Sequence, residues 1–441
     1  MQCYILNVAC YMLTIIHYQL ANYQLQSYAM LKNYFKIAIA VLKRRKFFTF
    51  ISLFGISFTL TIIIVLAAFT DNVISANYPE TNRDRSLYIL LVKQVDPKQN
   101  GQMTGPASYY FMDHFAGSMK TPEKVAIATF FSATNAYVRN EKLVINMKFT
   151  NDEFWDVMQY DFLEGKPFTK QQIDNGERVA VITEDTKKSY FGDLTGVVGK
   201  YIETDNVQYR VSGVVKTPPV TMIVSYADIF VPYTVSKADF RSKGYRGEYY
   251  AILMGKSATD LKAMKEEYAS VVSKIPAIDK DYTELYSYAD TYFESFIRSS
   301  PFGSKESSGI TVFITIIIVF ILLFMLLPTL NLVNINISRI MERSSEIGVR
   351  KAFGASSKTL VYQFIVENII LTFLGAAIGL LLSFIIIQVI NSSDLISNLH
   401  LTINFTVLCY SLLACLVFGL LSGVYPAWRM SKLHVVNALK G

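Results

Sequence analysis

Residues 337–358 form a charged strip between two long apolar runs. The strip reads ISRIMERSSEIGVRKAFGASSK and carries five basic and two acidic side chains. Glu346 precedes Arg350 by four residues, the favourable order for an ion pair on a helix, but such a pair contributes only about 0.3 kcal/mol. Ile347 and Phe353 beside these charges are typical of a short amphipathic helix that docks in a groove of a soluble partner. The alternative is an ordinary loop that is basic only because membrane topology requires it.

The sequence contains no catalytic or metal-binding constellation that stands out. Residues 192–201, GDLTGVVGKY, resemble a phosphate-binding loop, but Leu194 stands where that motif needs glycine and Tyr201 where it needs serine or threonine. The histidines are scattered and form no metal-ligand pair. We therefore expect no catalytic, cofactor or metal site on this chain, and no enzymatic activity of its own. The four cysteines lie outside the polar middle of the chain, at Cys3, Cys10, Cys409 and Cys415.

Charge and hydropathy divide the chain into a polar middle and apolar flanks. The chain has 441 residues, of which 52% are hydrophobic and 17% charged. Between Asp71 and Glu306 lie 31 of the 35 acidic and 28 of the 42 basic side chains, so the net charge of +7 comes from basic stretches beside apolar segments. This distribution is typical of membrane topology and excludes a nucleic-acid partner.

Four apolar segments predict an α-helical membrane protein with four transmembrane helices. Each is long enough to cross a bilayer at about 1.5 Å per residue. The fourth contains Gly419 and Gly423, and the third contains Gly375 and Gly379; both pairs have the spacing that suits close helix contact. We place the spans at residues 47–70, 309–338, 359–390 and 403–424.

Basic residues set the predicted orientation. The stretches 32–46, 339–358 and 425–441 are basic, whereas the short loop 391–402 has no basic residue. Both termini are therefore expected in the cytoplasm, with residues 71–308 and the loop 391–402 outside the cell membrane.

The first 29 residues carry no charge and match no targeting signal. Met30 opens a stretch that predicts a basic amphipathic cytoplasmic helix over residues 30–46. We expect the natural start at Met30, with residues 1–29 as a leader that is not native.

The outer segment predicts a large α+β domain. Residues 259–275 place six apolar side chains on one helical face: Leu261, Met264, Tyr268, Val271, Val272 and Ile275. Phe154 and Trp155 are expected in the core. Strands are expected at 86–92, 124–129, 142–149, 178–183, 207–215, 228–233 and 249–255.

The charged strip resembles the cytoplasmic loop of the MacB/FtsX family of ABC-transporter permeases. The motif E-R-x-x-E-I-G-x-R-K-A-x-G-A is met by residues 342–355, and Asn334 ends the preceding span as in the family. The tail from Pro426 also resembles the family's ending, although alanine and proline are replaced at two positions. Residues 183–219 resemble a segment of the MacB-type periplasmic core domain, with Tyr190, Phe191, Gly192, Gly199, Lys200, Val211, Gly213, Val214 and Pro218 in the matching places.

The resemblance implies a MacB-like periplasmic core domain over residues 71–308, made of a porter-like lobe and a second lobe inserted at about 125–225. An FtsX-like permease domain over residues 309–441 would follow. The permease would work as a dimer of two copies or of two related chains, in a bacterial inner membrane and in contact with its lipid. A periplasmic adaptor or outer-membrane protein is a further possible partner.

In this family an ATPase is fused or supplied separately, and only a short basic segment precedes the first span here. We therefore expect a separate ABC ATPase chain that binds ATP and Mg²⁺. The coupling strip 339–358 would contact it through Glu342, Arg343, Glu346, Ile347, Gly348, Arg350, Lys351, Phe353 and Gly354.

The resulting functional prediction is a mechanotransmitting permease for efflux or extraction of an amphipathic peptide, drug or lipid-linked substrate. Lipoprotein release is the alternative within the same fold. FtsX-like signalling to an external cell-wall hydrolase or sensor kinase is an alternative of another class, and the large outer domain favours transport over it.

Overall fold

The computed structural model describes residues 36–431 apart from 38, 41, 45, 99–100, 139–140, 193, 277–281, 305–306, 343–348, 350–352, 354–356 and 394–397. These residues divide into two units. The helix bundle comprises the described parts of residues 1–69, 318–389 and 402–441. The sheet domain comprises residues 70–317 and 390–401. The predicted leader, the start at Met30 and the last ten residues lie outside the described part.

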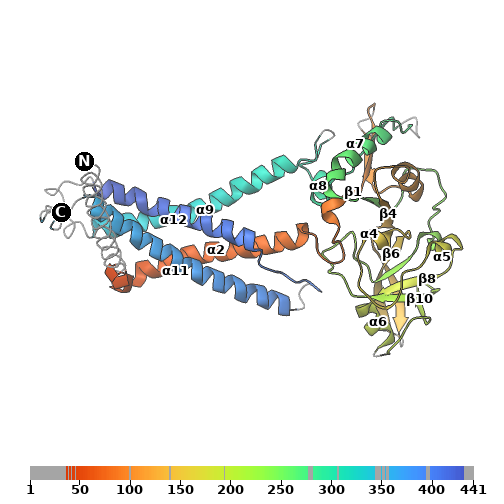
Figure 1. Cartoon of the computed structure of the whole chain (residues 1–441), viewed down its shortest axis with the longest axis horizontal. Helices are drawn as coiled ribbons and strands as arrows, with labels where there is room; N and C mark the ends of the chain where they lie inside the picture. Colours follow the sequence, from red (N-terminus) through yellow and green to blue (C-terminus); the bar gives the residue numbers. More distant parts are fainter. Residues whose placement is uncertain are drawn as a thin grey trace, which may run out of the picture. The chain divides into compact units, whose positions relative to one another are not determined.

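Four long helices supply the apolar segments (Figure 1). They are α2 (Lys46–Ile74), α9 (Ile310–Met341), α11 (Ser357–Ser392) and α12 (Phe405–Ser431). Within them, Lys46–Ile74, Val361–Ser392 and Phe405–Pro426 are long and apolar enough to cross a membrane. These three candidate spans coincide with three of the four predicted ones. α9 is helical over 32 residues, but its continuously described apolar part is Ile310–Leu326. Its role as a fourth span stays a prediction.

The residues before the first span are helical wherever they are described between 36 and 44. Leu42 is buried there against Ile370 and Leu371 of α11. Residues 30–35 lie outside the described part, so a cytoplasmic amphipathic helix over the whole of 30–46 stays a prediction.

The sheet domain is built on one ten-stranded mixed sheet and one three-stranded sheet. The large sheet has the order β1-β12-β4-β6-β11-β8-β10-β7, with β5 beside β6 and β9 beside β10. The pairs β10/β8 and β11/β6 are parallel. The strands are β1 (Ser86–Ile89), β4 (Lys124–Thr129), β5 (Ser132–Val138), β6 (Glu141–Thr150), β7 (Phe162–Gly165), β8 (Val179–Thr183), β9 (Tyr201–Thr204), β10 (Val207–Val215), β11 (Ile229–Pro232) and β12 (Tyr249–Met254).

The small sheet has the order β13-β2-β3. Its strands are β2 (Val92–Asp96), β3 (Gly101–Gly105) and β13 (Glu284–Ser287). The single strand predicted over residues 86–92 was wrong in this respect, because the chain leaves the large sheet after Ile89 and enters the small one at Val92. An unbroken apolar run cannot show that its two halves pair with different neighbours.

Short helices cover the sheets. They are α3 (Tyr109–Phe111), α4 (Phe154–Val157), α5 (Lys170–Asp174), α6 (Glu184–Phe191), α7 (Leu261–Val272) and α8 (Tyr292–Arg298). A π-helical turn at Met112–Ala116 and single 3₁₀ turns at Arg83–Arg85, Tyr233–Val235 and Ala258–Asp260 complete the described elements.

β12 shows why the core lies on both faces of the large sheet. All six of its residues are buried, and successive side chains point to opposite faces. Tyr250, Ile252 and Met254 join one hydrophobic cluster, which also contains Phe154 and Trp155. The other three residues join a second cluster, on which α7 packs. The predicted face of that helix is confirmed: Met264 and Tyr268 are buried, and the other four residues pack against the same cluster.

Candidate functional site

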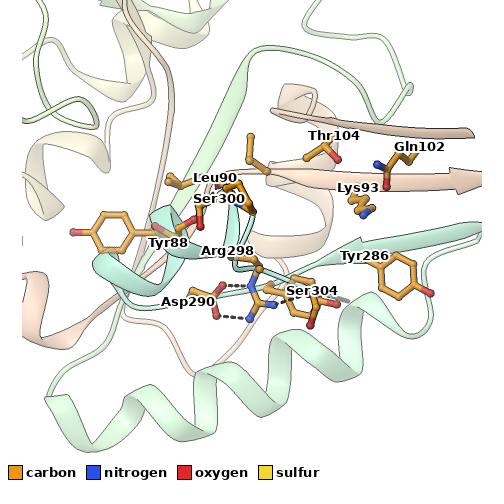
Figure 2. A pocket seen from close by; sticks show the side chains of 16 residues that line it. Tyr88, Leu90, Lys93, Gln102, Thr104, Tyr286, Asp290, Arg298, Ser300 and Ser304 are labelled. Atoms are coloured by element: carbon orange, nitrogen blue, oxygen red, sulfur yellow. Dashed lines mark hydrogen bonds and ion pairs between the residues drawn. The ribbon is translucent and has the colours of Figure 1, made fainter. Parts of the chain in front are cut away.

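A pocket of about 400 Å³ opens beside the small sheet (Figure 2). Lys93 of β2 and Gln102 and Thr104 of β3 line it from the strands. Residues of the segment from Asp290 to Ser304, which contains α8, line another side. The remaining lining residues are Tyr88, Leu90, Leu91, Tyr286 and Tyr288. A volume of this order is typical of small-ligand sites. The lining is mostly polar and aromatic, which suits a ligand held by hydrogen bonds and aromatic contacts.

The floor of the pocket is fixed by an ion pair across α8. Arg298, in the last turn, donates through Nε and Nη2 to the two carboxylate oxygens of Asp290, with 3.0 Å for the second bond. Its guanidinium also lies 3.8 Å from the centre of the Tyr288 ring. Asp290 is tied to β1, because its N–H and C=O exchange hydrogen bonds with those of Tyr88. Figure 2 shows this ion pair across the pocket from Lys93, Gln102 and Thr104.

A second cluster, the α2 clamp, consists of Glu80, Arg83, Ser225 and Tyr292. Arg83 donates to Glu80 at 2.8 Å, and both side chains are buried. Its Nη1 donates to the carbonyls of Val73 and Ser75, at 2.7 and 2.8 Å, so the guanidinium holds the end of α2. Ser225 donates to the other Glu80 oxygen at 2.6 Å.

The same guanidinium connects the end of α2 to α8. The Arg83 Cζ atom lies 3.5 Å from the centre of the Tyr292 ring in the first turn of α8. The chain continues from α8 toward α9. The α2 clamp therefore joins the segment that follows α2 to the helix that precedes α9. No sequence motif predicted this cluster, because its four residues lie up to 212 positions apart in the chain and each contributes one side chain.

Lys148 forms a third buried polar centre, inside the large sheet. Its Nζ donates to the carbonyls of Thr129 and Val224, at 2.9 and 2.8 Å, and lies 3.2 Å from the Tyr250 hydroxyl. Burial lowers the pKa of the ammonium group to about 7, and the charge of Glu80 opposes this shift. Lys148 therefore pins the segment before β11 to the sheet.

The helix bundle contains close contacts at the predicted glycines. A Cβ atom on Gly379 would lie 2.9 Å from the Ser57 carbonyl oxygen of α2, and one on Gly375 would lie 2.6 Å from Ile56. On α12, a Cβ atom on Gly419 would lie 2.3 Å from the Thr372 side chain of α11, and one on Gly423 would lie 2.5 Å from the Asn368 side chain. The prediction of close helix contact is confirmed for both pairs.

Several buried polar side chains of the bundle form hydrogen bonds between helices. Asn336 of α9 donates to the Asn368 side chain at 3.0 Å and to the Ser422 carbonyl at 3.1 Å, joining three helices. Thr61 of α2 donates to the Gly379 carbonyl at 3.1 Å. These bonds satisfy polar groups that would be costly inside a membrane.

Most of the predicted coupling residues lie outside the described part: Arg343, Glu346, Ile347, Gly348, Arg350, Lys351 and Gly354. Glu342 and Phe353 are described. Both are exposed, and the Phe353 side chain has an exposed fraction of 89%, the largest among the exposed large hydrophobic residues described. The Phe353 N–H donates to the Val349 carbonyl at 3.0 Å, the spacing of one helical turn. That the coupling residues form one docking site for the ATPase stays a prediction.

Among the described residues, no group of three or more histidine, cysteine, aspartate or glutamate side chains is placed to hold a metal ion. The described cysteines, Cys409 and Cys415, are free thiols.

Two family models match the chain in the order of its units. The MacB-like periplasmic core domain matches residues 49–271, which is half of the chain. The FtsX-like permease C-terminal region matches residues 318–435.

Curated relatives are permeases or permease fusions. The ABC transporter permease YknZ of Bacillus subtilis is 23% identical over 318 residues, which cover 72% of this chain and 75% of YknZ. The macrolide export ATP-binding/permease protein MacB of Pasteurella multocida is 22% identical over 66% of this chain and 42% of its own length. The pyoverdine export ATP-binding/permease protein PvdT of Pseudomonas aeruginosa is 26% identical over 66% of this chain and 41% of its own length. The chain thus spans less than half of the MacB and PvdT relatives.

Solved structures of outer domains also match. The extracellular domain of YknZ from Gram-positive bacteria aligns with 42% of this chain and 91% of its own, at 20% identity and a TM-score of 0.33. The periplasmic region of MacB from Actinobacillus actinomycetemcomitans aligns with 49% of this chain and 94% of its own, at 16% identity and a TM-score of 0.35.

The two family models, found in this order on one chain, agree with the resemblance of the charged strip. The chain belongs to the MacB/FtsX family of ABC-transporter permeases, with a MacB-like periplasmic core domain followed by an FtsX-like permease region.

Proposed function

We propose that this chain is the permease subunit of a mechanotransmitting ABC transporter. A cytoplasmic ABC ATPase on a separate chain hydrolyses ATP with Mg²⁺, and the permease passes the resulting motion to its outer domain. The motion drives efflux or extraction of an amphipathic peptide, drug or lipid-linked substrate. The names of MacB and PvdT, which describe export of a macrolide and of pyoverdine, support an export direction.

The α2 clamp is the observation that carries this proposal. Arg83 holds the end of α2 to α8, and α8 leads toward α9. A displacement of α2 or of α9 would therefore act on the same buried, hydrogen-bonded cluster of the sheet domain. Because packed and hydrogen-bonded contacts deform little, such a cluster transmits displacement rather than absorbing it.

The contacts within the helix bundle favour a role in mechanical transmission rather than a role as a solute channel. Two of its described buried polar side chains, Asn336 and Asn368, bind each other and the backbone. Close glycine contacts fix α11 against α2 and α12. A rigid helix set of this kind suits movement as a unit.

We propose four membrane spans, with α9 as the second. Its 32 helical residues exceed the length needed to cross a bilayer, about 20 residues. Both termini and the strip 339–358 then lie in the cytoplasm, and residues 71–308 lie outside. We propose that the permease works as a dimer of two copies or of two related chains, together with the separate ATPase.

Phe353 offers the sharpest test of ATPase docking. An aromatic ring with 89% of its surface exposed is an expected anchor for a groove on a partner. We expect Phe353→Ala to lower recovery of the co-purifying ATPase in mild detergent by at least about tenfold, the loss that corresponds to about 1.4 kcal/mol. Charge reversal at both Glu346 and Arg350 is expected to act in the same direction.

Phe405→Ala is the matched control. Phe405 is 76% exposed and begins α12, at the opposite end of that helix from the cytoplasmic tail in the proposed topology. ATPase recovery should be unchanged in this variant. Equal recovery from Phe353→Ala, from the charge-reversed variant and from the unaltered chain would refute docking at the strip. Failure to recover any ATPase with the unaltered chain would refute the transporter proposal.

A further inference from the structure

We propose that the free edge of β3 is a binding site for an extended segment of a partner polypeptide that carries an acidic side chain. The segment adds to the small sheet as a fourth strand. Its alternate side chains enter two hollows that lie on opposite faces of that sheet. This proposal concerns binding alone and stands independently of transport.

β3 is an open edge among the described residues. In the small sheet it pairs with β2, and its other side has no described strand partner. Its sequence is GQMTG, and Gln102, Met103 and Thr104 are exposed. Natural edges are usually blocked by lysine, proline or a covering element, because an open edge invites another strand. β3 itself has no charge and no proline.

Each face of the small sheet borders a hollow. Residues opposite one another in an antiparallel pair point to the same face, and β3 pairs Thr104 with Lys93 and Met103 with Gln94. Lys93 lines the 400 Å³ pocket described above. Gln94 and Met103 line another hollow of about 200 Å³, with Tyr245 and Arg246.

A strand added at β3 continues this alternation. Its residues would point in turn toward the larger pocket and toward the smaller hollow. Strand addition combines backbone hydrogen bonds for affinity with side-chain pockets for specificity. Both components are present on this edge.

The charges of the hollows select an acidic side chain. Lys93 forms no ion pair with any described residue, whereas Arg298 is already paired with Asp290. In the smaller hollow, Arg246 donates through Nε to Gln94 at 2.9 Å. An acidic side chain beside Lys93 would therefore meet a cation that forms no ion pair with any described residue, whereas the Asp290 carboxylate in the same pocket is held by Arg298.

A second copy of this chain is a poorer occupant of the same edge. β3 pairing with β3 of another copy would bring the sequence GQMTG against itself, and this sequence has no acidic residue. The charge pattern therefore favours a different polypeptide.

The test uses the full chain in detergent micelles and a fluorescent eight-residue peptide of alternating threonine and valine. One central position carries glutamate, glutamine or lysine. Fluorescence anisotropy should show the glutamate peptide binding at least about tenfold more tightly than the lysine peptide, since a charge-assisted hydrogen bond is lost. A fourth peptide carries glutamate with N-methyl groups on two adjacent central amides, which blocks both edges of the strand. This peptide should lose binding.

Protein variants locate the site. Lys93→Glu should reverse the preference from glutamate to lysine, and Lys200→Glu, in an exposed turn before β9, should not. The proposal is overturned if the N-methylated peptide binds equally well, if Lys93→Glu leaves the preference unchanged, or if no peptide binds. It is also overturned if Met103→Cys, with the native cysteines replaced, forms a disulfide between two copies, since a second copy then occupies the edge.

Discussion

Lys148 is a buried lysine in β6, inside the large sheet. Its side chain has no exposed surface, and its three hydrogen-bond neighbours come from β4, β12 and the segment before β11. Glu80 is the charged group that influences it, and the neighbouring Tyr250 hydroxyl stays protonated because burial raises the pKa of that phenol well above its ordinary value. Of the Lys148 ammonium and the Tyr250 hydroxyl, the ammonium is therefore the group that we expect to lose its proton near neutral pH.

The pH dependence of unfolding tests this expectation. The folded domain releases the Lys148 proton above about pH 7, whereas an unfolded chain keeps it to about pH 10.5. The unfolded state therefore binds more protons between these values, and the free energy of unfolding rises with pH across that window. We expect the melting temperature of the detergent-solubilised chain to rise between pH 7 and pH 9. Lys148→Met should remove this rise, and exposed Lys200→Met should keep it. An unchanged pH profile in Lys148→Met would contradict the assignment.

The ion pair between Glu80 and Arg83 is expected to be a large single contribution to stability. The exposed fractions of the two side chains are 0% and 4%. Removal of one partner from a buried pair typically costs about 3–5 kcal/mol, because the other charge stays buried without compensation. Arg83→Met should therefore lower the melting temperature strongly. The double variant with Glu80→Gln should recover part of the loss, which distinguishes an uncompensated charge from lost packing.

At the scale of elements, the glycines determine how closely the helices of the bundle approach. Gly379 faces backbone atoms of Ser57, which cannot move aside as the end of a side chain can. Gly55, on α2 of the same bundle, has no atom within 4 Å of the position that a Cβ would take. The two glycines therefore form a matched pair, in which one is required by a contact and the other is not.

Alanine at each position should have opposite effects. Gly379→Ala is expected to destabilise the bundle by about 1–3 kcal/mol, the usual cost of overpacking. Gly55→Ala is expected to be neutral or slightly stabilising, because alanine favours a helix over glycine by up to about 1 kcal/mol. Thermal unfolding of both variants in the same detergent measures the difference. Similar melting temperatures would show that the α2/α11 contact is loose.

The elements show what periodicity alone can predict. Apolar runs located all four long helices, and the face of α7 was predicted residue by residue. Periodicity did not reveal β3 or β13, because GQMTG and ELYS lack the long apolar alternation of buried strands. The α2 clamp was missed for another reason, since Arg83 and Glu80 read as ordinary surface charges until the fold buries them together.

At the scale of the whole molecule, topology decides whether the strip around Phe353 can meet a cytoplasmic ATPase. The first, third and fourth predicted spans correspond to helices of sufficient length and apolar character. α9 therefore determines the side on which Phe353 lies relative to residues 71–308. If α9 crosses the membrane, Phe353 and Lys200 lie on opposite sides; if it does not, they lie on the same side.

Cysteine labelling in intact cells distinguishes these two topologies. In a chain whose native cysteines are replaced, single cysteines at Lys200, Phe353 and His400 occupy positions that are exposed in the structure. A membrane-impermeant maleimide should label Lys200→Cys and His400→Cys from outside, and should label Phe353→Cys only after the cells are opened. Because 89% of the Phe353 surface is accessible, burial does not account for an absence of labelling in intact cells. Labelling of Phe353→Cys in intact cells would place the strip outside and would remove the physical basis for coupling to ATP hydrolysis.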